Sequence, residues 1–442
     1  MAGSRRRQGL ASGLTLSFLL VAACSATDGN GSGLSWKSGN WVNGDSDRLQ
    51  RFEAMRGRPS DAVTQSLRGK DTWAEHAGAR SEAEVEREFR RSPSDWRATP
   101  PTFAGIFEGS AWMAHVWGGY PATEHRRRII HLAWMNVVPR TVGNGWENGR
   151  YRNPEIWRQI KEGAADRYMF LLGRKFAYLD ERYGDTRYPM TIDLGYEWTI
   201  PSHPDLPEGS YRVGDTTHYT YRDFPYGWSR LVRVFKEGYK YQRGGRPCSY
   251  RFAWRPQLRF VALDRTSSEN RLVRHEELWP NLAQDWIIAE DVVIDGVKVL
   301  PAGPIGRAAD ILAVSWHDSS RERVRGSSST APGNNWQQIL DGFPTHWGLQ
   351  EAADFAARQG VLLALPEWAA RGASHPPASP YPGDVYRFTF AFLKRNAGIL
   401  AYETVFDQGS GNLYRPWTPT PPSPEQDPLR VYRELWGSGP GA

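Results

Sequence analysis

The sequence predicts a (β/α)8 TIM barrel, the α/β fold in which eight parallel strands alternate with helices, built as a single domain with long βα loops. Short runs rich in β-branched and aromatic residues alternate with longer amphipathic stretches from about Leu34 onward. We count eight such runs, the number that closes a barrel. The chain has 442 residues, a length that these barrels reach when their loops carry insertions.

The predicted strands follow one another along the whole chain, at residues 34–42, 61–68, 128–137, 189–198, 249–256, 309–318, 361–368 and 398–406. Helical stretches lie between them, and most end at a glycine, which readily stops a helix. Junctions such as ARQGVLLALPEW run from helix through glycine into strand, which indicates short αβ loops. The long connections, 69–127, 199–222 and 257–308, are therefore expected mostly at the C-terminal ends of the strands, where barrel enzymes have their sites.

The N-terminal segment predicts export. Residues 5–7 are arginines, and the apolar run at 10–23 is too short to span a bilayer. The sequence VAAC resembles a bacterial lipoprotein box, so we expect 1–23 to be a signal peptide and Cys24 to be lipidated. The alternative is a secretory signal cut nearby, with Cys24 incidental. On the first hypothesis the protein is extracellular, and a lipid anchor is its only link to the membrane.

The remaining chain is expected to divide into a flexible tether at 24–35 and one barrel domain at 36–437. The formal charge of +6 includes the three signal arginines, so the mature chain carries about +3, too little for a nucleic-acid footprint. The only cysteines are Cys24 and Cys248, and the ten histidines are scattered. We therefore predict no disulfide within the mature chain, no metal and no cofactor.

Two glutamates stand at the C-terminal ends of the fourth and seventh predicted strands. Because strand side chains alternate, Asp193 and Glu197 share the inward face in MTIDLGYEW, and Glu367 has the same place in VLLALPEW. Glycoside hydrolysis uses such a pair, and carboxyls about 5 to 5.5 Å apart retain the sugar's configuration. Each glutamate alone could be a capping or ion-paired loop residue, but their joint occurrence favours catalysis.

Aromatic rings at the predicted strand ends are candidate sugar platforms, because sugar C–H faces stack on aromatic planes. The candidates are Tyr196, Trp198, Trp254, Trp316 and Trp368. A tryptophan in a strand is also commonly a core residue. Alternation points Trp198 and Trp368 away from the barrel interior unless the following loop turns them.

Polar neighbours of these rings have more than one interpretation. His317 and Asp318 could hydrogen-bond sugar hydroxyls or orient a glutamate. Asp193 could be a buried structural acid paired with an arginine such as Arg251 or Arg255.

With these residues the sequence resembles glycoside hydrolase family 26, retaining (β/α)8 enzymes best known as endo-β-mannanases. The resemblance covers nearly all of residues 34–437 and implies that Glu197 is the proton donor and Glu367 the nucleophile. It rests on the segments LGYEWTIP, LALPEWAA, ADILAVSWHDSS and GNWVNGDSDRLQRFEAMRGRPSDAVTQS. The implied activity is double displacement on a β-linked polysaccharide, with mannan as the first substrate to consider.

The sequence departs from the family's pattern at several positions. Tyr196 stands where a histidine usually precedes the acid/base, and Asp193 where an arginine is expected four residues before it. Trp316 and His317 stand where the family often has an aspartate and a tyrosine.

Two alternatives therefore stay open: the same mechanism on a xylan, a β-glucan or a cell-envelope glycan, and a catalytically inactive surface barrel that binds glycan. A carboxyl separation far from the retaining range would favour the inactive barrel. On each hypothesis the partner is a polysaccharide, nucleic acid is not a partner, and the protein is expected to be a monomer.

Overall fold

The described part of the chain begins after the predicted signal peptide. In a computed structural model the described residues are 34–41, 46–67, 70–103, 129–134, 137–183, 190–195, 199, 202–258, 260–263, 271–318, 332–342, 344, 346–370, 382–406 and 423–437. Residues 1–33, and with them Cys24, lie outside these ranges.

Eight parallel strands close into a barrel in which spatial order follows chain order. The strands are β1 (Ser38–Trp41), β2 (Ala62–Leu67), β3 (Ile129–Trp134), β6 (Met190–Leu194), β9 (Arg251–Trp254), β16 (Ile311–Asp318), β17 (Leu362–Ala370) and β18 (Leu400–Val405). The barrel is closed because β1 pairs in parallel with both β2 and β18. The predicted (β/α)8 fold is thus confirmed. Every strand falls within its predicted range, except that β17 continues to Ala370.

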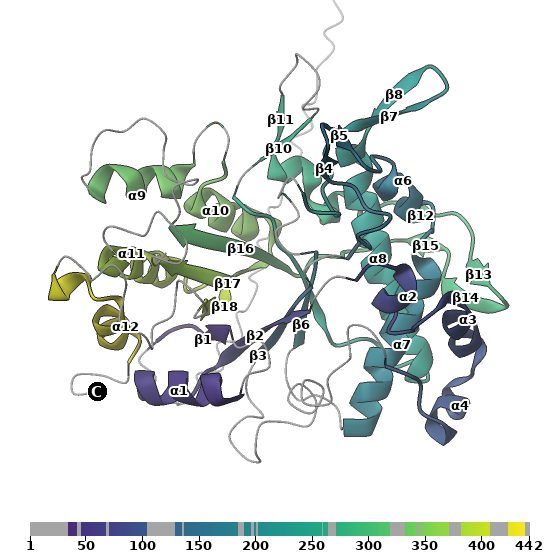
Figure 1. Ribbon diagram of the computed structural model, residues 1–442, viewed down its shortest axis with the longest axis horizontal. Helices are drawn as coiled ribbons and strands as arrows, with labels where there is room; N and C mark the ends of the chain where they lie inside the picture. Colours follow the sequence, from purple (N-terminus) through teal and green to yellow (C-terminus); the bar gives the residue numbers. More distant parts are fainter. Residues whose placement is uncertain are drawn as a thin grey trace, which may run out of the picture. The chain divides into compact units, whose positions relative to one another are not determined.

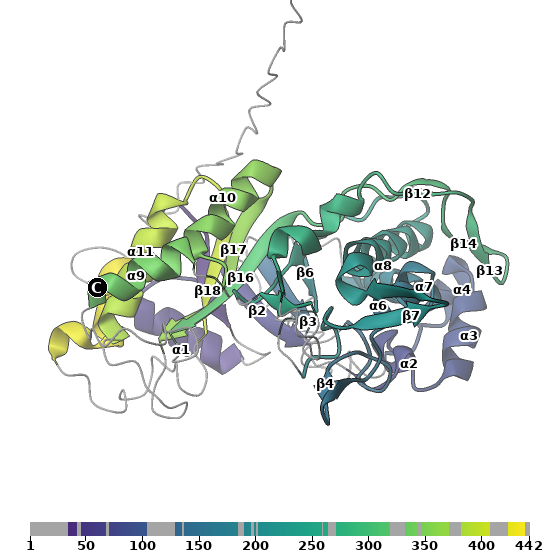
Figure 2. The same cartoon turned by 90° about the horizontal axis from the view of Figure 1, so that it is seen from above.

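Helices surround this barrel, as Figures 1 and 2 show. Phe176 and Phe235, from the two long neighbouring helices α7 and α8, pack with ring centroids 5.3 Å apart. Phe235 also meets Phe252 of β9 at 5.4 Å, which joins this helix pair to the barrel wall. The helices are α1 (Ser46–Arg56), α2 (Trp73–His76), α3 (Glu82–Arg90), α4 (Pro93–Ala98), α6 (Ile156–Lys161), α7 (Asp166–Tyr183), α8 (Thr220–Gln242), α9 (Pro332–Asp341), α10 (Leu349–Gln359), α11 (Pro382–Arg395) and α12 (Pro428–Trp436). None of the described helices has both the length and the apolar character needed to cross a membrane.

The connections between the main elements carry small structures that the sequence pattern did not predict. Antiparallel two-stranded sheets form between β4 (Trp146–Glu147) and β5 (Arg150–Tyr151) and between β7 (Ser210–Val213) and β8 (Thr216–Tyr219). The connection between β9 and β16 holds three more pairs and two 3-10 turns. These are β10 (Val261–Ala262) with β11 (Leu272–Val273), β12 (Ile287–Ile288) with β15 (Gly303–Pro304), β13 (Val292–Ile294) with β14 (Val297–Leu300), η3 (His275–Leu278) and η4 (Pro280–Ala283). A further 3-10 turn, η6 (Pro424–Gln426), precedes α12.

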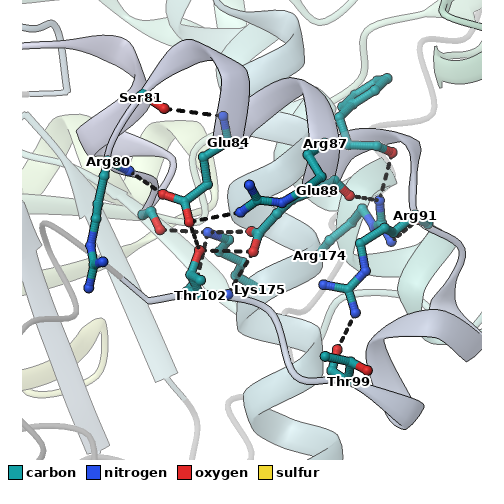
Figure 3. A network of polar contacts seen from close by, with 12 residues as sticks. Arg80, Ser81, Glu84, Arg87, Glu88, Arg91, Thr99, Thr102, Arg174 and Lys175 are labelled. Atoms are coloured by element: carbon teal, nitrogen blue, oxygen red, sulfur yellow. Dashed lines mark hydrogen bonds and ion pairs between the residues drawn. The ribbon is translucent and has the colours of Figure 1, made fainter.

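A buried ion pair attaches the segment that contains α2, α3 and α4 to α7 (Figure 3). Lys175 Nζ lies 2.9 Å from Glu88 Oε2, and both side chains are almost fully buried. The same ammonium donates to the carbonyl oxygens of Gly78 and Thr102 at 2.6 and 2.8 Å. The neighbouring Arg174 donates to carbonyl oxygens at the C-terminal end of α3, where helix carbonyls lack partners within the helix. These cations therefore join polar groups of this segment to α7, beside an apolar cluster in which Val85 and Trp96 are buried together with Leu171 of α7.

Candidate active site

Inward-facing side chains from five barrel strands, and from the residue directly after a sixth, form one polar cluster in the barrel. The cluster consists of His131 on β3, Asp193 on β6, Arg255 directly after β9, Ser315 on β16, Glu367 on β17 and Tyr402 on β18. All are buried, and Glu367 keeps 8% of its surface exposed.

Arg255 holds the Glu367 carboxylate. Its Nη2 donates to Glu367 Oε2 at 2.5 Å, and its Nε donates to Ser315 Oγ at 2.7 Å. Trp41 on β1 lies beside the same guanidinium, with Cζ 5.5 Å from the ring centroid. A guanidinium held on several sides cannot turn away from its carboxylate, so the orientation of Glu367 is fixed by a charge-assisted hydrogen bond.

Asp193 is a second carboxyl against the same arginine. Its Oδ2 lies 3.4 Å from Arg255 Nη1 and 3.5 Å from His131 Nε2. Burial, with a smaller contribution from the Glu367 charge, raises the pKa of Asp193 to about 8 against the opposing effect of Arg255. The interpretation of Asp193 as a buried acid paired with an arginine is confirmed for Arg255, whereas Arg251 is exposed. Asp193 stands where the family pattern has an arginine, and it contacts an arginine from the next strand.

His131 and Tyr402 extend the cluster across the barrel. His131 Nδ1 hydrogen-bonds Tyr402 Oη, and both residues are fully buried. Burial, with the charge of Arg255, lowers the pKa of His131 well below its usual value, while burial raises the pKa of Tyr402. The imidazole is therefore neutral and the phenol protonated at neutral pH.

A buried aspartate, Asp205, lies against the glycine that follows β6. Asp205 accepts hydrogen bonds from the backbone N–H groups of Val137 and Val138 at 3.0 and 2.7 Å. Gly195, the first residue after β6, has φ +75°, and a Cβ there would lie 2.3 Å from Asp205 Oδ2. Only glycine satisfies both the backbone conformation and this close approach. Burial raises the pKa of Asp205 to about 8.

Several predicted site residues lie outside the described residues. These are Tyr196, Glu197 and Trp198, directly after Gly195, and the side chains of His317 and Asp318, whose backbone belongs to β16. Their predicted roles remain predictions.

Three of the predicted sugar platforms are core residues. Trp254, Trp316 and Trp368 have no exposed surface. Each is the strand neighbour of an inward-facing residue, as Trp254 is of Arg255 and Trp368 is of Glu367, so alternation points the rings outward toward the helices. The expectation that these rings contact sugar is therefore wrong. The physical reason is that neighbouring residues on a strand face opposite sides, so a ring next to an inward-facing residue points out of the barrel.

Their contacts show what these rings stabilise instead. Trp254 packs edge-on against Trp279 with centroids 5.3 Å apart. Trp368 donates its indole N–H to Glu403 Oε2 at 2.7 Å, and Trp436 of α12 donates to the other oxygen at 3.0 Å. Trp316 packs against a phenylalanine of α11. These rings attach surrounding helices and loops to the barrel.

Sequence reasoning missed His131, Ser315 and Tyr402 as members of the site, and it named Arg255 only as a partner of Asp193. The available signal was the alternation itself, since these residues share the inward face with the predicted glutamates. Among the described residues no three His, Cys, Asp or Glu side chains are grouped as a metal site would need.

The fold and this cluster define a (β/α)8-barrel protein with an arginine-held carboxylate at the strand ends. Comparison with solved structures finds proteins described as members of glycoside hydrolase family 26. GH26C from Muricauda sp. MAR_2010_75 matches with 12% identity and a TM-score of 0.48, over 91% of this chain and 87% of that one. The catalytic domain of the Bacillus sp. JAMB-750 GH26 endo-β-1,4-mannanase matches with 12% identity and a TM-score of 0.45, over 92% and 88%.

A GH26 β-mannanase from Bacteroides ovatus has 11% identity and a TM-score of 0.45, over 90% of this chain and 89% of that one. No protein-family model and no curated protein matches the sequence. The barrel assignment rests on the strand pairing of this chain itself.

Proposed function

We propose that the protein is a retaining glycoside hydrolase that cleaves a β-linked polysaccharide, with mannan as the first substrate class. The observation that carries the proposal is the position of Glu367. Its carboxylate faces into the barrel near the end of β17 and is held by Arg255, and the residue keeps 8% of its surface exposed. A carboxylate that is fixed in place and still reachable from outside is what a glycosidase nucleophile requires.

In the proposed reaction, Glu197 is the second carboxyl. It protonates the glycosidic oxygen while Glu367 attacks the anomeric carbon and forms a glycosyl ester. Glu197, now a base, takes a proton from water, which releases the sugar with its configuration retained. Arg255 acts on the attacking group, because its hydrogen bond to Oε2 orients the carboxylate.

Mannan comes first because the motifs around both glutamates resemble family 26. The departures at Tyr196 and at His317 keep xylan, β-glucan and cell-envelope glycans as further substrates of the same mechanism. These departures change residues near the two glutamates, and both glutamates are still present in the sequence.

Reducing-sugar release from a panel of neutral polysaccharides tests the proposal. The chain from Ser25, its Glu367→Ala variant and a Glu434→Ala control are compared. Glu434 is an exposed glutamate on α12 that pairs with Arg430. We expect release from one glycan, equal release by the control, and a loss of at least a thousandfold for Glu367→Ala, the scale seen when a covalent nucleophile is removed. Undiminished release by Glu367→Ala would contradict the proposal. Binding of one glycan with no release from any would favour the inactive barrel.

A further inference from the structure

Strand β17, which lies between β16 and β18 (Figure 1), carries one residue more than either neighbour beside Glu367. Residues 364–367 of β17 span the same length as residues 313–315 of β16, so four residues lie opposite three. On the other side, residues 365–368 lie opposite residues 403–405 of β18, again four against three. An extra residue in one strand of a ladder is a β-bulge. Pro366 lies inside both stretches and is paired in neither register.

A proline suits the extra position of this bulge. The extra residue is left out of the ladder, so its backbone N–H would be buried without a ladder partner. Pro366 is buried and has no N–H to satisfy. Its carbonyl oxygen accepts a hydrogen bond from the hydroxyl of Thr404 on β18. The one polar backbone group of Pro366 therefore has a partner on the neighbouring strand.

The hydroxyl of Thr404 is itself oriented by a second threonine. Thr64 Oγ1 on β2 lies 2.7 Å from Thr404 Oγ1, and both side chains are fully buried. A hydroxyl has one proton to donate, so Thr64 donates to Thr404, and Thr404 donates to Pro366. This short chain of hydrogen bonds joins β2 and β18 to the bulge in β17.

The bulge determines which way Glu367 faces. Ala364 packs inside the barrel with residues of β9, β16 and β18, whereas Leu365 packs outside it in the cluster that includes residues of α10 and α11. In an uninterrupted strand, position 366 would then face inward and position 367 outward. The extra residue shifts the alternation by one, so Glu367 faces inward and contacts Arg255.

We propose that Thr404 is a positioning residue for Glu367, because its hydroxyl holds the bulge that turns the Glu367 carboxylate toward Arg255. The inference deepens the proposed function and rests on it, since the position of Glu367 affects turnover only if Glu367 attacks sugar. Thr404 acts on the reaction through the backbone of Pro366.

The position of a nucleophile has a large effect on rate. A displacement of about 1 Å from the geometry of attack can cost about a hundredfold. Without the Thr404 hydroxyl, the carbonyl of Pro366 loses this buried partner, and the bulge relaxes toward a regular ladder, which turns Glu367 away from Arg255. The substitution removes no contact with the substrate, so the loss falls on kcat and leaves KM nearly unchanged.

Thr404→Val tests this step, because it keeps the shape of the side chain and removes the hydroxyl. On the glycan that the wild-type enzyme cleaves, we expect kcat to fall by about tenfold to a hundredfold with KM within about twofold of its wild-type value. Thr404→Ser keeps the hydroxyl and should restore most of kcat. A wild-type kcat in Thr404→Val would overturn the proposal.

Thr389 supplies the matched control. It is a buried threonine on α11 whose hydroxyl also donates to a backbone carbonyl, that of Val385, at 2.9 Å. Thr389→Val should lower the melting temperature and leave kcat unchanged. Equal losses of kcat from Thr389→Val and Thr404→Val would overturn the proposal, since a general loss of stability would account for both.

A second variant keeps the test decisive if Thr404→Val does not fold. Thr64→Val removes the hydroxyl that donates to Thr404. A lowered kcat with an unchanged KM in this variant supports the proposal. A kcat equal to that of Thr389→Val overturns it.

Crystal structures of the wild type and the variants without substrate read the position of the carboxylate directly. We expect the hydrogen bond from Arg255 Nη2 to Glu367 Oε2, which is 2.5 Å long, to be lengthened or lost in Thr404→Val and unchanged in Thr389→Val. An unchanged position of Glu367 in Thr404→Val would overturn the proposal.

The positioning role and the proposed function fail separately. A displaced Glu367 in Thr404→Val, together with no sugar release by the wild type, would contradict the glycosidase function and leave the positioning by Thr404 in place. Sugar release by the wild type, together with an undisplaced Glu367 and a wild-type kcat in Thr404→Val, would contradict the positioning alone.

Discussion

Asp193 binds a proton in the folded protein at pH values where the unfolded chain has lost it. Its pKa is raised from 3.8 to about 8, mainly because it is fully buried. Between these values the folded state binds more protons than the unfolded state. The free energy of unfolding therefore falls as pH rises through this window. Asp205, raised to a similar value by burial, contributes in the same direction.

Asp193→Asn should remove one of these two contributions. We expect the free energy of unfolding to fall less steeply for the variant than for the wild type between about pH 4 and pH 8. Denaturant unfolding at a series of pH values measures both slopes. The slope that remains in the variant should diminish further in Asp193→Asn/Asp205→Asn. Identical slopes for wild type and Asp193→Asn would show that Asp193 is ionised in the folded protein.

At the scale of single residues, the alternation of side chains along a strand predicted which residues face into the barrel. Glu367 and Asp193 were placed on the inward face because their strands were found correctly. His131 and Tyr402 were missed because one polar residue in an apolar strand does not show that a partner faces it across the barrel. Trp254 was misplaced because being near a strand end does not determine which side a ring faces.

At the scale of elements, Gly195 joins β6 to the part of the sequence that carries Glu197. Gly195 begins the segment that leads to Glu197, and its left-handed backbone packs against the Asp205 carboxylate. A side chain at position 195 would have to displace the Asp205 carboxylate.

Gly195→Ala should therefore destabilise the protein and reduce turnover. Gly214→Ala is the matched control, because Gly214 also has a positive φ, of +59°, but a Cβ there meets no atom within 4 Å. The control should cost roughly 1–2 kcal/mol for the backbone alone. Gly195→Ala should cost more, since the new methyl also meets Asp205. Thermal unfolding and sugar release measure the two effects, and equal losses from both variants would contradict a role for the Asp205 contact.

A separate prediction concerns the Lys175–Glu88 ion pair, which attaches the segment with α2, α3 and α4 to α7. Lys175→Met should lower the free energy of unfolding by roughly 3–5 kcal/mol, because it leaves Glu88 buried without its cation. Arg87→Met breaks a pair with Glu84 in which the arginine side chain is 62% exposed. That control should cost at most about 1 kcal/mol. Denaturant unfolding compares them, and a similar small loss from both would show that the Lys175 pair does not hold the segment.

Element prediction succeeded where periodicity was long enough to detect. The eight barrel strands were found because each combines alternation with a helix-to-strand boundary, as in ARQGVLLALPEW. The paired strands β4 and β5, and β10 and β11, have two residues each. A strand of two residues is too short to show alternation. Such pairs depend on loop packing, which the sequence pattern does not show.

At the scale of the whole molecule, barrel closure brings together residues that lie far apart in the chain. His131 and Tyr402 are 271 positions apart and share a hydrogen bond, and Arg255 and Glu367 are 112 apart. The number of strands predicted the fold, and the fold placed these residues at one centre. The central claim is that this centre forms a covalent bond to sugar through Glu367.

Covalent trapping tests that claim most directly. The chain from Ser25 is incubated with activated 2-deoxy-2-fluoro glycosides, which slow release of the ester, and is analysed by intact mass and peptide mapping. We predict the addition of one glycosyl group on the peptide that carries Glu367, and no addition to Glu367→Gln. A label on a different carboxyl, or hydrolysis with inverted configuration and no label, would contradict the account.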